Sequence, residues 1–432
     1  MAKPASPEVP SPTPSSTPPV ASSAAGTPAL GKRLQSLDAY RGLIMITLAF
    51  GGFGLAKTAK NFHELYPEAS YWESIQYQFS HAEWVGCSYW DLIQPSFMFM
   101  VGVSLAWSFG KRRDQGDSYP RMLLHAAARS LILVGLSIFL MSQWSSATDW
   151  EFTNVLGQIG LGYFFLFLLW GWPFRVQAIA LGVILLSTWI AFEAYPGAGI
   201  DPQQGAPEVG VKAEWAQEHL QGVRPAWHKN ANIAHAIDRT FLNWFPREKP
   251  WLFSRGGYAT ISFWPSLATM LLGLMAGELL RSNRPEKTKL LLLLAAGAAG
   301  LLLGYLLNLS GICPMVKRIW TPSWAFFSTG WCLLILGALY GIVDILGFRR
   351  WTFPLVVVGA NSILIYCMSI SLKPYTEKQI RTHLGQDVFS LYGWPSTETA
   401  AAISPMVESI AVGLAFWLVC YYCYRHKIFI RI

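Results

Sequence analysis

Two titratable side chains stand ten residues apart at the start of a long apolar stretch, and their types suit acid–base chemistry. His81 precedes the stretch and Asp91 lies at its mouth, within the segment FSHAEWVGCSYWDLIQPSFMFMVGVSLAWS. A neutral imidazole near pH 7 is a natural general base for an amine or a hydroxyl, and a carboxylate can orient it. The alternative interpretation is structural, with His81 as a hydrogen-bonded residue at the interface and Asp91 as a cap or ion-pair partner.

A second charged pair lies at the start of the first apolar stretch, in the sequence SLDAYRG. Asp38 and Arg41 stand three residues apart, so a helix places both on one face, where they can form an ion pair. Charged groups inside a membrane are costly and therefore mark functional sites by default. This pair is either a neutralised, capped helix start or a place where Arg41 holds a phosphate group.

The elements that must position these residues follow from composition. Of the 432 residues, 53% are hydrophobic and 13% are charged, whereas a soluble domain carries about a quarter charged residues. This composition excludes a disordered, collagen-like or disulfide-stapled secreted protein for the bulk of the chain. A helix that crosses a bilayer needs about 20 mostly apolar residues. Ten stretches meet this requirement, near 37–56, 88–109, 122–141, 154–172, 176–194, 259–280, 290–307, 323–345, 353–372 and 405–424. We therefore expect an all-α, polytopic membrane helix bundle.

The distribution of basic residues predicts the orientation of this bundle. Lys and Arg concentrate in the short loops at one side, which include Lys111, Arg112 and Arg113, and such loops face the cytoplasm. With ten spans, both termini are then cytoplasmic. The net charge of +8 therefore indicates membrane topology, and we expect no nucleic-acid partner.

Two segments lie outside the predicted spans. Residues 1–33 are rich in Pro, Ser and Ala and cannot bury enough apolar surface to fold, so we expect a disordered cytoplasmic tail before a membrane domain of residues 34–432. The tail lacks the apolar core of a secretory signal. Residues 195–258 are too long for a simple connection, and we expect them to form a functional cap on the extracytoplasmic side.

Several other polar and aromatic residues each allow two interpretations. Lys317 lies in a short outer loop and either anchors to lipid headgroups or faces an anionic substrate. The surplus of Trp on the outer side, which includes Trp84 and Trp320, fits a stacking surface for a sugar or the core of an outer domain. Asn361 and Ser362 either form interhelical hydrogen bonds or line a cofactor channel.

Motifs of several common enzyme classes are missing from the sequence. It contains no phosphate-binding P-loop, no nucleophile elbow and no metalloprotease HExxH motif. The six cysteines show no metal-site spacing, and we expect no metal cofactor.

Six motifs, in order along residues 34–372, together resemble one family. They are SLDAYRG, SHAEWVGCSYWDLIQPSFMFMVGVS, NVLGQIGLGYF, SFWPSLATMLLGLMAGELLRS, KRIWTPSWAFFSTGWCLLILGALY and VVVGANSILIY. The chain is similar to the heparan-alpha-glucosaminide N-acetyltransferase family and its bacterial relatives. The resemblance implies that His81, in a His-Ala-x-Trp-x-Gly pattern, is the active-site histidine and that Asp91, in an Asp-Leu-x-x-Pro pattern, accompanies it. The chain departs from the animal enzyme at Ala49, where that enzyme has an Asn.

The resemblance implies a transmembrane acetyltransferase. It would move acetyl from cytosolic acetyl-CoA to an amine or hydroxyl of an extracytoplasmic sugar or glycan, with His81 as general base or transient acetyl carrier. We predict that acetyl-CoA is held by Asp38, Arg41, Lys111, Arg112, Arg113, Asn361 and Ser362, and that the acceptor contacts Glu83, Trp84, Lys317 and Trp320. The alternative is a membrane transporter or envelope-assembly protein that uses the same scaffold without acetyl transfer.

The same resemblance predicts location and partners. We expect an integral protein of the bacterial inner membrane that meets acetyl-CoA, an amino sugar or glycan acceptor, and the lipid bilayer. Self-association into a homodimer is a further alternative.

Overall fold

The structure is a computed structural model that describes residues 1, 34–197 and 199–430. The membrane unit runs from Leu34 to the C-terminal end of the chain, and the predicted tail lies outside the described residues apart from Met1. Within the described ranges the regular structure is helical, and the only β-type pairings are two isolated bridges. The α-helices are α1 (Gln35–Ala49), α2 (Leu55–Leu65), α3 (Tyr71–Gln78), α4 (Ile93–Asp114), α5 (Tyr119–Ser142), α6 (Val155–Leu169), α7 (Phe174–Ala194), α8 (Ala213–His219), α9 (Ile233–Phe241), α10 (Phe263–Arg281), α11 (Glu286–Leu309), α12 (Pro322–Leu339), α13 (Phe353–Gly359), α14 (Ser362–Ser371), α15 (Lys373–Leu384) and α16 (Thr397–Arg425).

The helices match the predicted membrane spans. Among the described residues, seven helices are long and apolar enough to cross a bilayer, and two further pairs pass the same test together although each is bent. The shorter apolar helix α6 occupies the remaining predicted stretch. The predicted fold class, an all-α membrane bundle, is confirmed.

The two bent pairs have local causes. Between α1 and α2 the chain turns by 47° at Gly51, Gly52 and Gly54, which adopt φ values of 55°, 61° and 69° that glycine tolerates. Between α13 and α14 the bend is 67°, and the buried Asn361 stands at the break. Its side-chain amide donates to the Ile428 carbonyl and accepts from the Ile430 amide, each at 3.0 Å, so it fastens the last described residues to the break.

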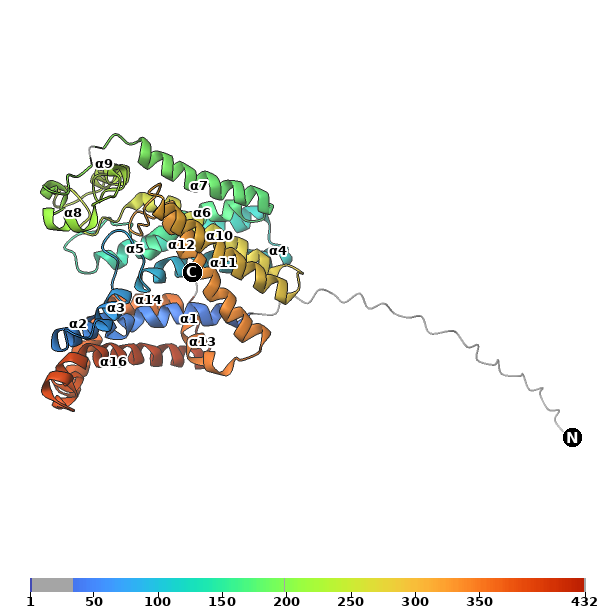
Figure 1. Cartoon of the computed structure of the whole chain (residues 1–432). Helices are drawn as coiled ribbons and strands as arrows, with labels where there is room; N and C mark the ends of the chain where they lie inside the picture. The colour runs from blue at the N-terminus through green and yellow to red at the C-terminus, as the bar shows by residue number, and fades with distance from the viewer. Residues whose placement is uncertain (2–33, 198, 431–432) are drawn as a thin grey trace. The chain divides into compact units, whose positions relative to one another are not determined.

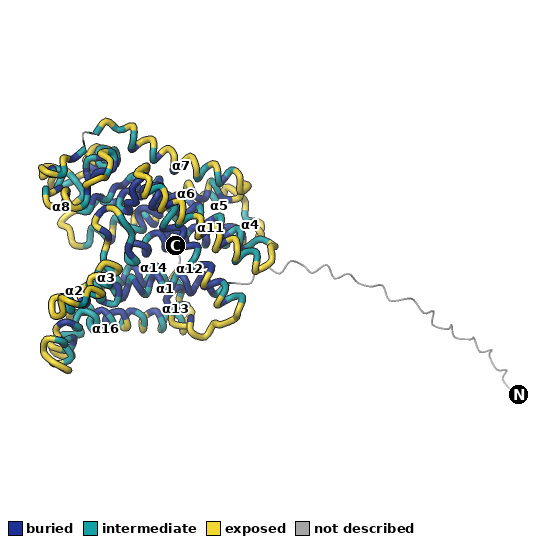
Figure 2. The backbone as a smooth tube through the Cα atoms, in the orientation of Figure 1, coloured by how far each residue is buried: buried dark blue, intermediate teal, exposed yellow. Residues whose placement is uncertain are grey.

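The centre of the bundle is the pair α4 and α10, which pack through small residues. A Cβ atom on Gly102 would lie 1.9 Å from the Met270 carbonyl oxygen, and one on Gly273 would lie 2.1 Å from that of Phe99. Glycine thus lets the two backbones approach closely, as is common between membrane helices. The apolar window of α4 is 72% buried, whereas that of α11 is only 17% buried, which suits a peripheral helix that faces lipid. Figure 2 shows the same contrast between a buried interior and exposed outer helices.

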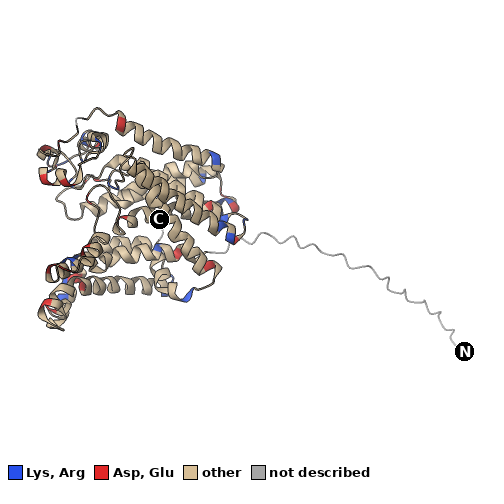
Figure 3. Cartoon of the chain, viewed as in Figure 1, with Lys and Arg blue, Asp and Glu red and all other residues tan. Residues whose placement is uncertain are grey.

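The long helices run between two sides of the unit, which we name by their residues (Figure 1). The basic side carries Lys111–Arg113 at the end of α4 and Arg281 at the end of α10, and an ion pair of 2.9 Å between Arg281 and Asp114 joins these ends. Figure 3 shows Lys and Arg gathered at the right-hand helix ends. The opposite side, which we call the loop side, carries residues 195–258 and the segment before α4.

Residues 195–197 and 199–258 form a cap whose apolar core also includes residues of the segments that it packs on. Trp84 and Trp227 are buried there with Val316, and the Trp84 indole donates to the Trp227 carbonyl at 3.0 Å. Trp227 also stacks on Phe192 at 4.7 Å between ring centroids. Both ring nitrogens of His228 are engaged by backbone, since Nδ1 accepts from the Ile200 amide and Nε2 contacts the Val223 carbonyl at 2.9 Å. The Trp surplus on this side therefore includes core residues.

Candidate functional site

The loop that carries His81 is fastened to a distant loop before α12. Val85 and Val316 form an antiparallel bridge, and the Gly86 amide donates to the Met315 carbonyl at 2.9 Å. Gly86 has φ of 131°, a conformation that favours glycine. This pairing brings Lys317 to residues more than 220 positions earlier in the chain.

Asp91 lies at the centre of the polar contacts made by these two loops. It is 1% exposed, and its Oδ1 lies 2.7 Å from His81 Nδ1 and 3.2 Å from Lys317 Nζ. Its Oδ2 accepts from the Ala82 amide at 3.0 Å, from the Ser88 amide at 3.3 Å and from the Ser88 hydroxyl at 3.0 Å. This many donors, one of them cationic, stabilise the carboxylate form of Asp91 in a buried place.

The contacts of Asp91 decide which nitrogen of His81 is available for chemistry. An ionised carboxylate accepts hydrogen bonds only, so the short contact to His81 Nδ1 assigns the proton to Nδ1. Lys317 Nζ also lies 3.2 Å from Nδ1, but two donors cannot bond each other, so both donate to Asp91. Nε2 is then the basic nitrogen, and the His81 side chain, 40% exposed, is open to a proton donor.

Lys317 is placed as a buried ion-pair partner and not as a headgroup anchor. Its side chain is 8% exposed and its ammonium group pairs with Asp91 at 3.2 Å. Burial lowers the pKa of Lys317 below the ordinary lysine value, while the Asp91 carboxylate opposes that shift. Asp91 therefore stabilises the positive charge of Lys317, and the hydrogen-bond donors around Asp91 stabilise its negative charge.

A cavity of ≈ 310 Å³ opens beside His81. It lies among the loop-side ends of the bundle helices and is lined by Leu48, His81, Trp90, Ile93, Gln94, Glu151, Thr153, Asn154, Val155, Tyr258, Lys317 and Tyr366. We call it the His81 cavity. It holds an imidazole, a lysine ammonium group and a carboxylate, so it can bind a small polar molecule and exchange a proton with it.

Glu151 also lines the His81 cavity, although its sequence context did not identify it as a site residue. It lies in the irregular segment before α6, and the Thr153 hydroxyl donates to its Oε1 at 2.6 Å. A single carboxylate before an apolar helix is too common to single out from sequence. Only the fold places it against the same cavity as His81.

Three of the predicted acceptor-binding residues lie elsewhere. Trp84 and Trp320 are each 2% exposed, and the Trp320 indole donates to the Thr269 hydroxyl at 3.1 Å. Glu83 lies at the surface of the cap, 3.9 Å from Arg318 and 3.2 Å from the Trp215 indole nitrogen. None of the three is among the described residues that line the His81 cavity.

The residues predicted to hold acetyl-CoA fall in two places on the basic side. Asp38 and Arg41 form the ion pair that their spacing predicts, at 2.5 Å, with Asp38 6% exposed. At the end of α4, Arg112 contacts Asp117 and His125, each at 3.2 Å, and Arg113 lies over the Trp170 ring at 5.2 Å. Lys111 is exposed beside them. Asn361 uses its amide on the C-terminal backbone, and Ser362 begins α14 next to it.

Arg129 is the second functional candidate that the sequence analysis did not select. It lies four residues after His125 on α5, hence on the same face. Its guanidinium donates to the Tyr163 hydroxyl at 3.2 Å, but its buried Nε has no hydrogen-bond partner among the described residues. A buried donor left open beside Arg112 and His125 fits an anionic group such as a phosphate.

The thiol of Cys87, six residues after His81, is not available as a nucleophile. Burial raises the pKa of the Cys87 thiol to about 12, which keeps it protonated and unreactive. Among the described residues, no cluster of three His, Cys, Asp or Glu side chains could hold a metal ion.

Comparison with known proteins finds two relatives for this chain. It is 25% identical to the human (Homo sapiens) heparan-alpha-glucosaminide N-acetyltransferase, over 94% of this chain and 60% of that protein. It is 23% identical to the mouse (Mus musculus) protein of the same name, over 93% of this chain and 60% of that protein. No family model matches the chain. The chain thus spans about 60% of the length of these curated relatives, and the family resemblance predicted from the motifs is confirmed.

Proposed function

We propose that this protein is a membrane acetyltransferase that transfers acetyl from acetyl-CoA to the amine of a sugar at the loop side. The observation that carries the proposal is the contact of Asp91 with His81 and Lys317, which both line the His81 cavity. The relatives' name, an N-acetyltransferase of a glucosaminide, supports the same reaction class. The basic side then faces the cytoplasm of a bacterial cell, where the donor is made.

His81 acts as the general base in this proposal. Acetyl-CoA supplies the acetyl group as a thioester. His81 Nε2 accepts the proton that the amine loses as its nitrogen bonds to the acetyl carbon, and returns it to the thiolate released when the carbon–sulfur bond breaks. Asp91 accepts the Nδ1 hydrogen bond and stabilises the imidazolium that forms in between.

Lys317 and Glu151 provide opposite charges at the cavity wall. Lys317 lines the cavity and can stabilise the negative charge that develops on the carbonyl oxygen. The Glu151 carboxylate attracts an acceptor that arrives as an ammonium ion, and this favours an amine over a hydroxyl as acceptor. The ammonium ion loses one proton to solvent, and the neutral amine that results is the nucleophile. The two residues together select an amino sugar and polarise the thioester.

The donor's phosphates would be held on the basic side by Arg112, Arg113 and Arg129. Guanidinium groups suit phosphate oxygens, and the open Nε of Arg129 is a donor without an internal partner among the described residues. Helix α4 runs from this cluster to the residues that follow Asp91, so its two ends connect the two halves of the proposed site. Arg41 stands as a further candidate at the start of α1.

The test is acetyl transfer by the purified full chain in nanodiscs, with acetyl-CoA and methyl β-glucosaminide, followed by mass spectrometry of the sugar. We expect His81→Ala to lower the rate by about 10²–10⁴-fold. His383→Ala, an exposed histidine on α15, is the matched control and keeps the normal rate. A normal rate for His81→Ala would show that His81 is not the general base. A wild-type protein that neither transfers acetyl nor gains thermal stability with acetyl-CoA would favour a transporter or assembly protein.

A further inference from the structure

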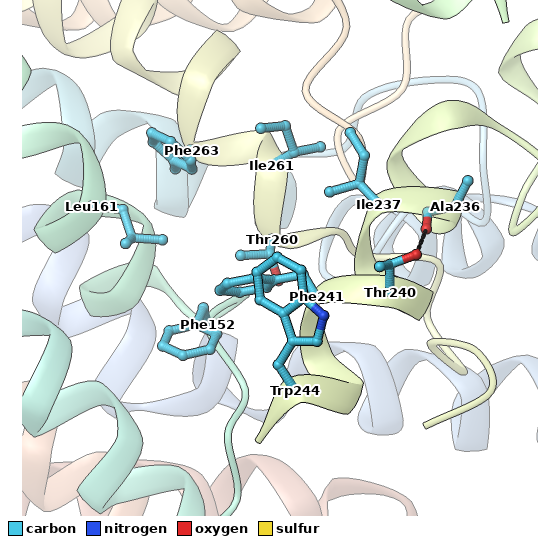
Figure 4. A pocket seen from close by; sticks show the side chains of 10 residues that line it. All are labelled: Phe152, Leu161, Ala236, Ile237, Thr240, Phe241, Trp244, Thr260, Ile261 and Phe263. Carbon is cyan, nitrogen blue, oxygen red and sulfur yellow. Dashed lines mark hydrogen bonds between the residues drawn. The ribbon is translucent and has the colours of Figure 1, made fainter. Parts of the chain in front are cut away.

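A second cavity lies directly behind the segments that line the His81 cavity. It is an open, apolar groove of ≈ 570 Å³ between the cap helix α9 and the membrane helices α6 and α10 (Figure 4). Side chains of Ile237, Phe241 and Trp244 line it from the cap, Phe152 lines it from the segment before α6, and Leu161 and Phe263 line it from the bundle. We call it the apolar groove.

The groove offers almost no polar partner to an occupant. The Thr240 hydroxyl donates to the Ala236 carbonyl within α9 at 3.3 Å, as Figure 4 shows. The remaining lining side chains are hydrocarbon or aromatic apart from Thr260, whose buried hydroxyl has no hydrogen-bond partner among the described residues. An occupant held there must therefore be apolar itself.

The groove and the His81 cavity share two extended segments. In residues 151–153, which precede α6 without regular secondary structure, Glu151 and Thr153 line the His81 cavity while Phe152 lines the groove. The same alternation holds around Ala259, which is extended, with Tyr258 on the cavity and Thr260 on the groove. Each of these two segments therefore contributes side chains to both the polar cavity and the apolar groove.

The groove also continues into the face of the bundle that meets lipid. Phe263 and Leu161 belong to helices long or apolar enough to lie in the membrane, and the exposed Phe165 stacks on Phe263 at 6.4 Å between centroids. Trp244, 74% exposed, stands at the rim on the cap side. A hydrocarbon chain can therefore enter from the outer part of the bilayer without crossing water.

We propose that the apolar groove binds the hydrocarbon chain of a membrane-anchored acceptor, a lipid-linked amino sugar whose head group reaches the adjacent His81 cavity. The proposal rests on the acetyltransferase function argued above. It adds that the chain is recognised as well as the sugar, because each part of such an acceptor has its own cavity on either side of residues 151–153 and 258–260.

The kinetic test compares two acceptors with the same head group, decyl β-glucosaminide below its micelle concentration and methyl β-glucosaminide. We expect the KM of the decyl compound to be at least about tenfold lower, because burial of several methylene groups favours binding. We expect the ratio of the two KM values to fall to about one in two variants. Trp244→Ser removes an aromatic side chain from the rim of the groove, and Ala236→Phe fills the groove. Trp144→Ser is the matched control, since Trp144 is equally exposed at 74% but does not line the groove, and it keeps the wild-type ratio. Equal KM values for the two acceptors in the wild type would overturn the proposal.

A binding measurement keeps this test separate from the acetyltransferase proposal. A decyl β-glucosaminide with a photoreactive diazirine on the chain is cross-linked to the full chain in nanodiscs, and labelled peptides are mapped. We expect label on the peptides of α9 and Trp244, displaced by excess decyl β-glucosaminide but not by methyl β-glucosaminide or added phosphatidylglycerol. Displacement by phosphatidylglycerol alone to the same degree would show an ordinary lipid site and overturn the proposal. If labelling succeeds but no acetyl is transferred, the catalytic proposal fails while the groove assignment stands.

Discussion

Asp91, beside the His81 cavity, and Asp238, beside the apolar groove, are both buried but have very different hydrogen-bond partners. Asp91 and Asp238 are both 1% exposed. Asp91 receives three hydrogen bonds on one oxygen and contacts His81 and Lys317 with the other. Asp238, on α9 behind the apolar groove, accepts one bond from the Thr260 amide at 2.8 Å, and its Oδ1 has no hydrogen-bond partner among the described residues.

This difference separates a buried carboxylate whose charge is stabilised by its partners from one whose charge is not. Burial raises the pKa of Asp238 to about 6, since a single backbone donor does not make up for lost water. Asp91 is no less buried, yet its donors and the neighbouring cation keep the charge favourable, so it can hold the Nδ1 proton of His81. Equal burial therefore does not distinguish the two carboxylates, whereas their partners do, and only Asp91 has the partners that the proposed chemistry needs.

The largest effect is expected from removing the negative charge of Asp91 beside the His81 cavity. Asp91→Asn keeps the shape of the side chain but accepts a weaker hydrogen bond from His81 Nδ1. It also leaves the Lys317 ammonium group without its counter-ion. We expect the rate constant kcat to fall by about 10²–10⁴-fold with little change in acceptor KM. Transfer kinetics with methyl β-glucosaminide measure this, and far-UV circular dichroism checks the fold. A kcat within about twofold of the wild type would mean that Asp91 does not support His81.

A middle-sized effect is expected at the wall that the two cavities share. Glu151→Gln removes the carboxylate from the His81 cavity while Phe152 next to it still faces the groove. The KM for an amino-sugar acceptor should rise about tenfold, because an ammonium group loses its charged partner. The decyl-to-methyl KM ratio should stay unchanged. Glu218→Gln, an exposed carboxylate of the cap, is the control. An unchanged KM would show that Glu151 does not select the amine.

The smallest effect is expected on stability, at the aspartate behind the groove. Because the folded pKa of Asp238 lies above its ordinary value of 3.8, its contribution to stability is full below about pH 4 and is lost as pH rises through about 6. Asp238→Asn cannot ionise, so it should be more stable than the wild type by on the order of 2 kcal/mol at pH 7.5 and equal to it at pH 4.

Thermal unfolding in detergent between pH 4 and pH 8 measures the difference. Asp201→Asn, an exposed aspartate of the same cap, serves as control and should shift the midpoint at neither pH. A difference in stability between Asp238→Asn and the wild type that does not change with pH would contradict the comparison. It would show that the charged form of Asp238 is stabilised as well as that of Asp91.

Much of the membrane fold was readable from the sequence. Ten apolar stretches match the seven long helices, the two bent pairs and α6, because the thickness of a bilayer sets a minimum length that composition reveals. The pairing of Asp38 with Arg41 also followed from helical spacing and is present at 2.5 Å. Local rules of this kind depend on neighbours along the chain.

The remainder depends on contacts between segments far apart in sequence. Lys317 reaches Asp91 across 226 residues through the Val85–Val316 bridge, and nothing in either segment alone indicates that pairing. Trp84 was expected to contact an acceptor, but it lies in the core of a cap whose packing no periodicity reports. Arg129 stands out because its buried Nε has no hydrogen-bond partner among the described residues, and only the packing of the helices shows this.

The sequence by itself determined that this is a helical membrane protein, which family it resembles, and that His81 and Asp91 stand together before α4. The tertiary structure decided that Lys317 completes the group with Asp91, that Glu151 joins the same cavity, and that an apolar groove lies behind it. The physical reason is that hydrophobic length and helical spacing are properties of one segment. A cavity and a buried charge network are properties of several segments at once, and they exist only when packing brings those segments into contact.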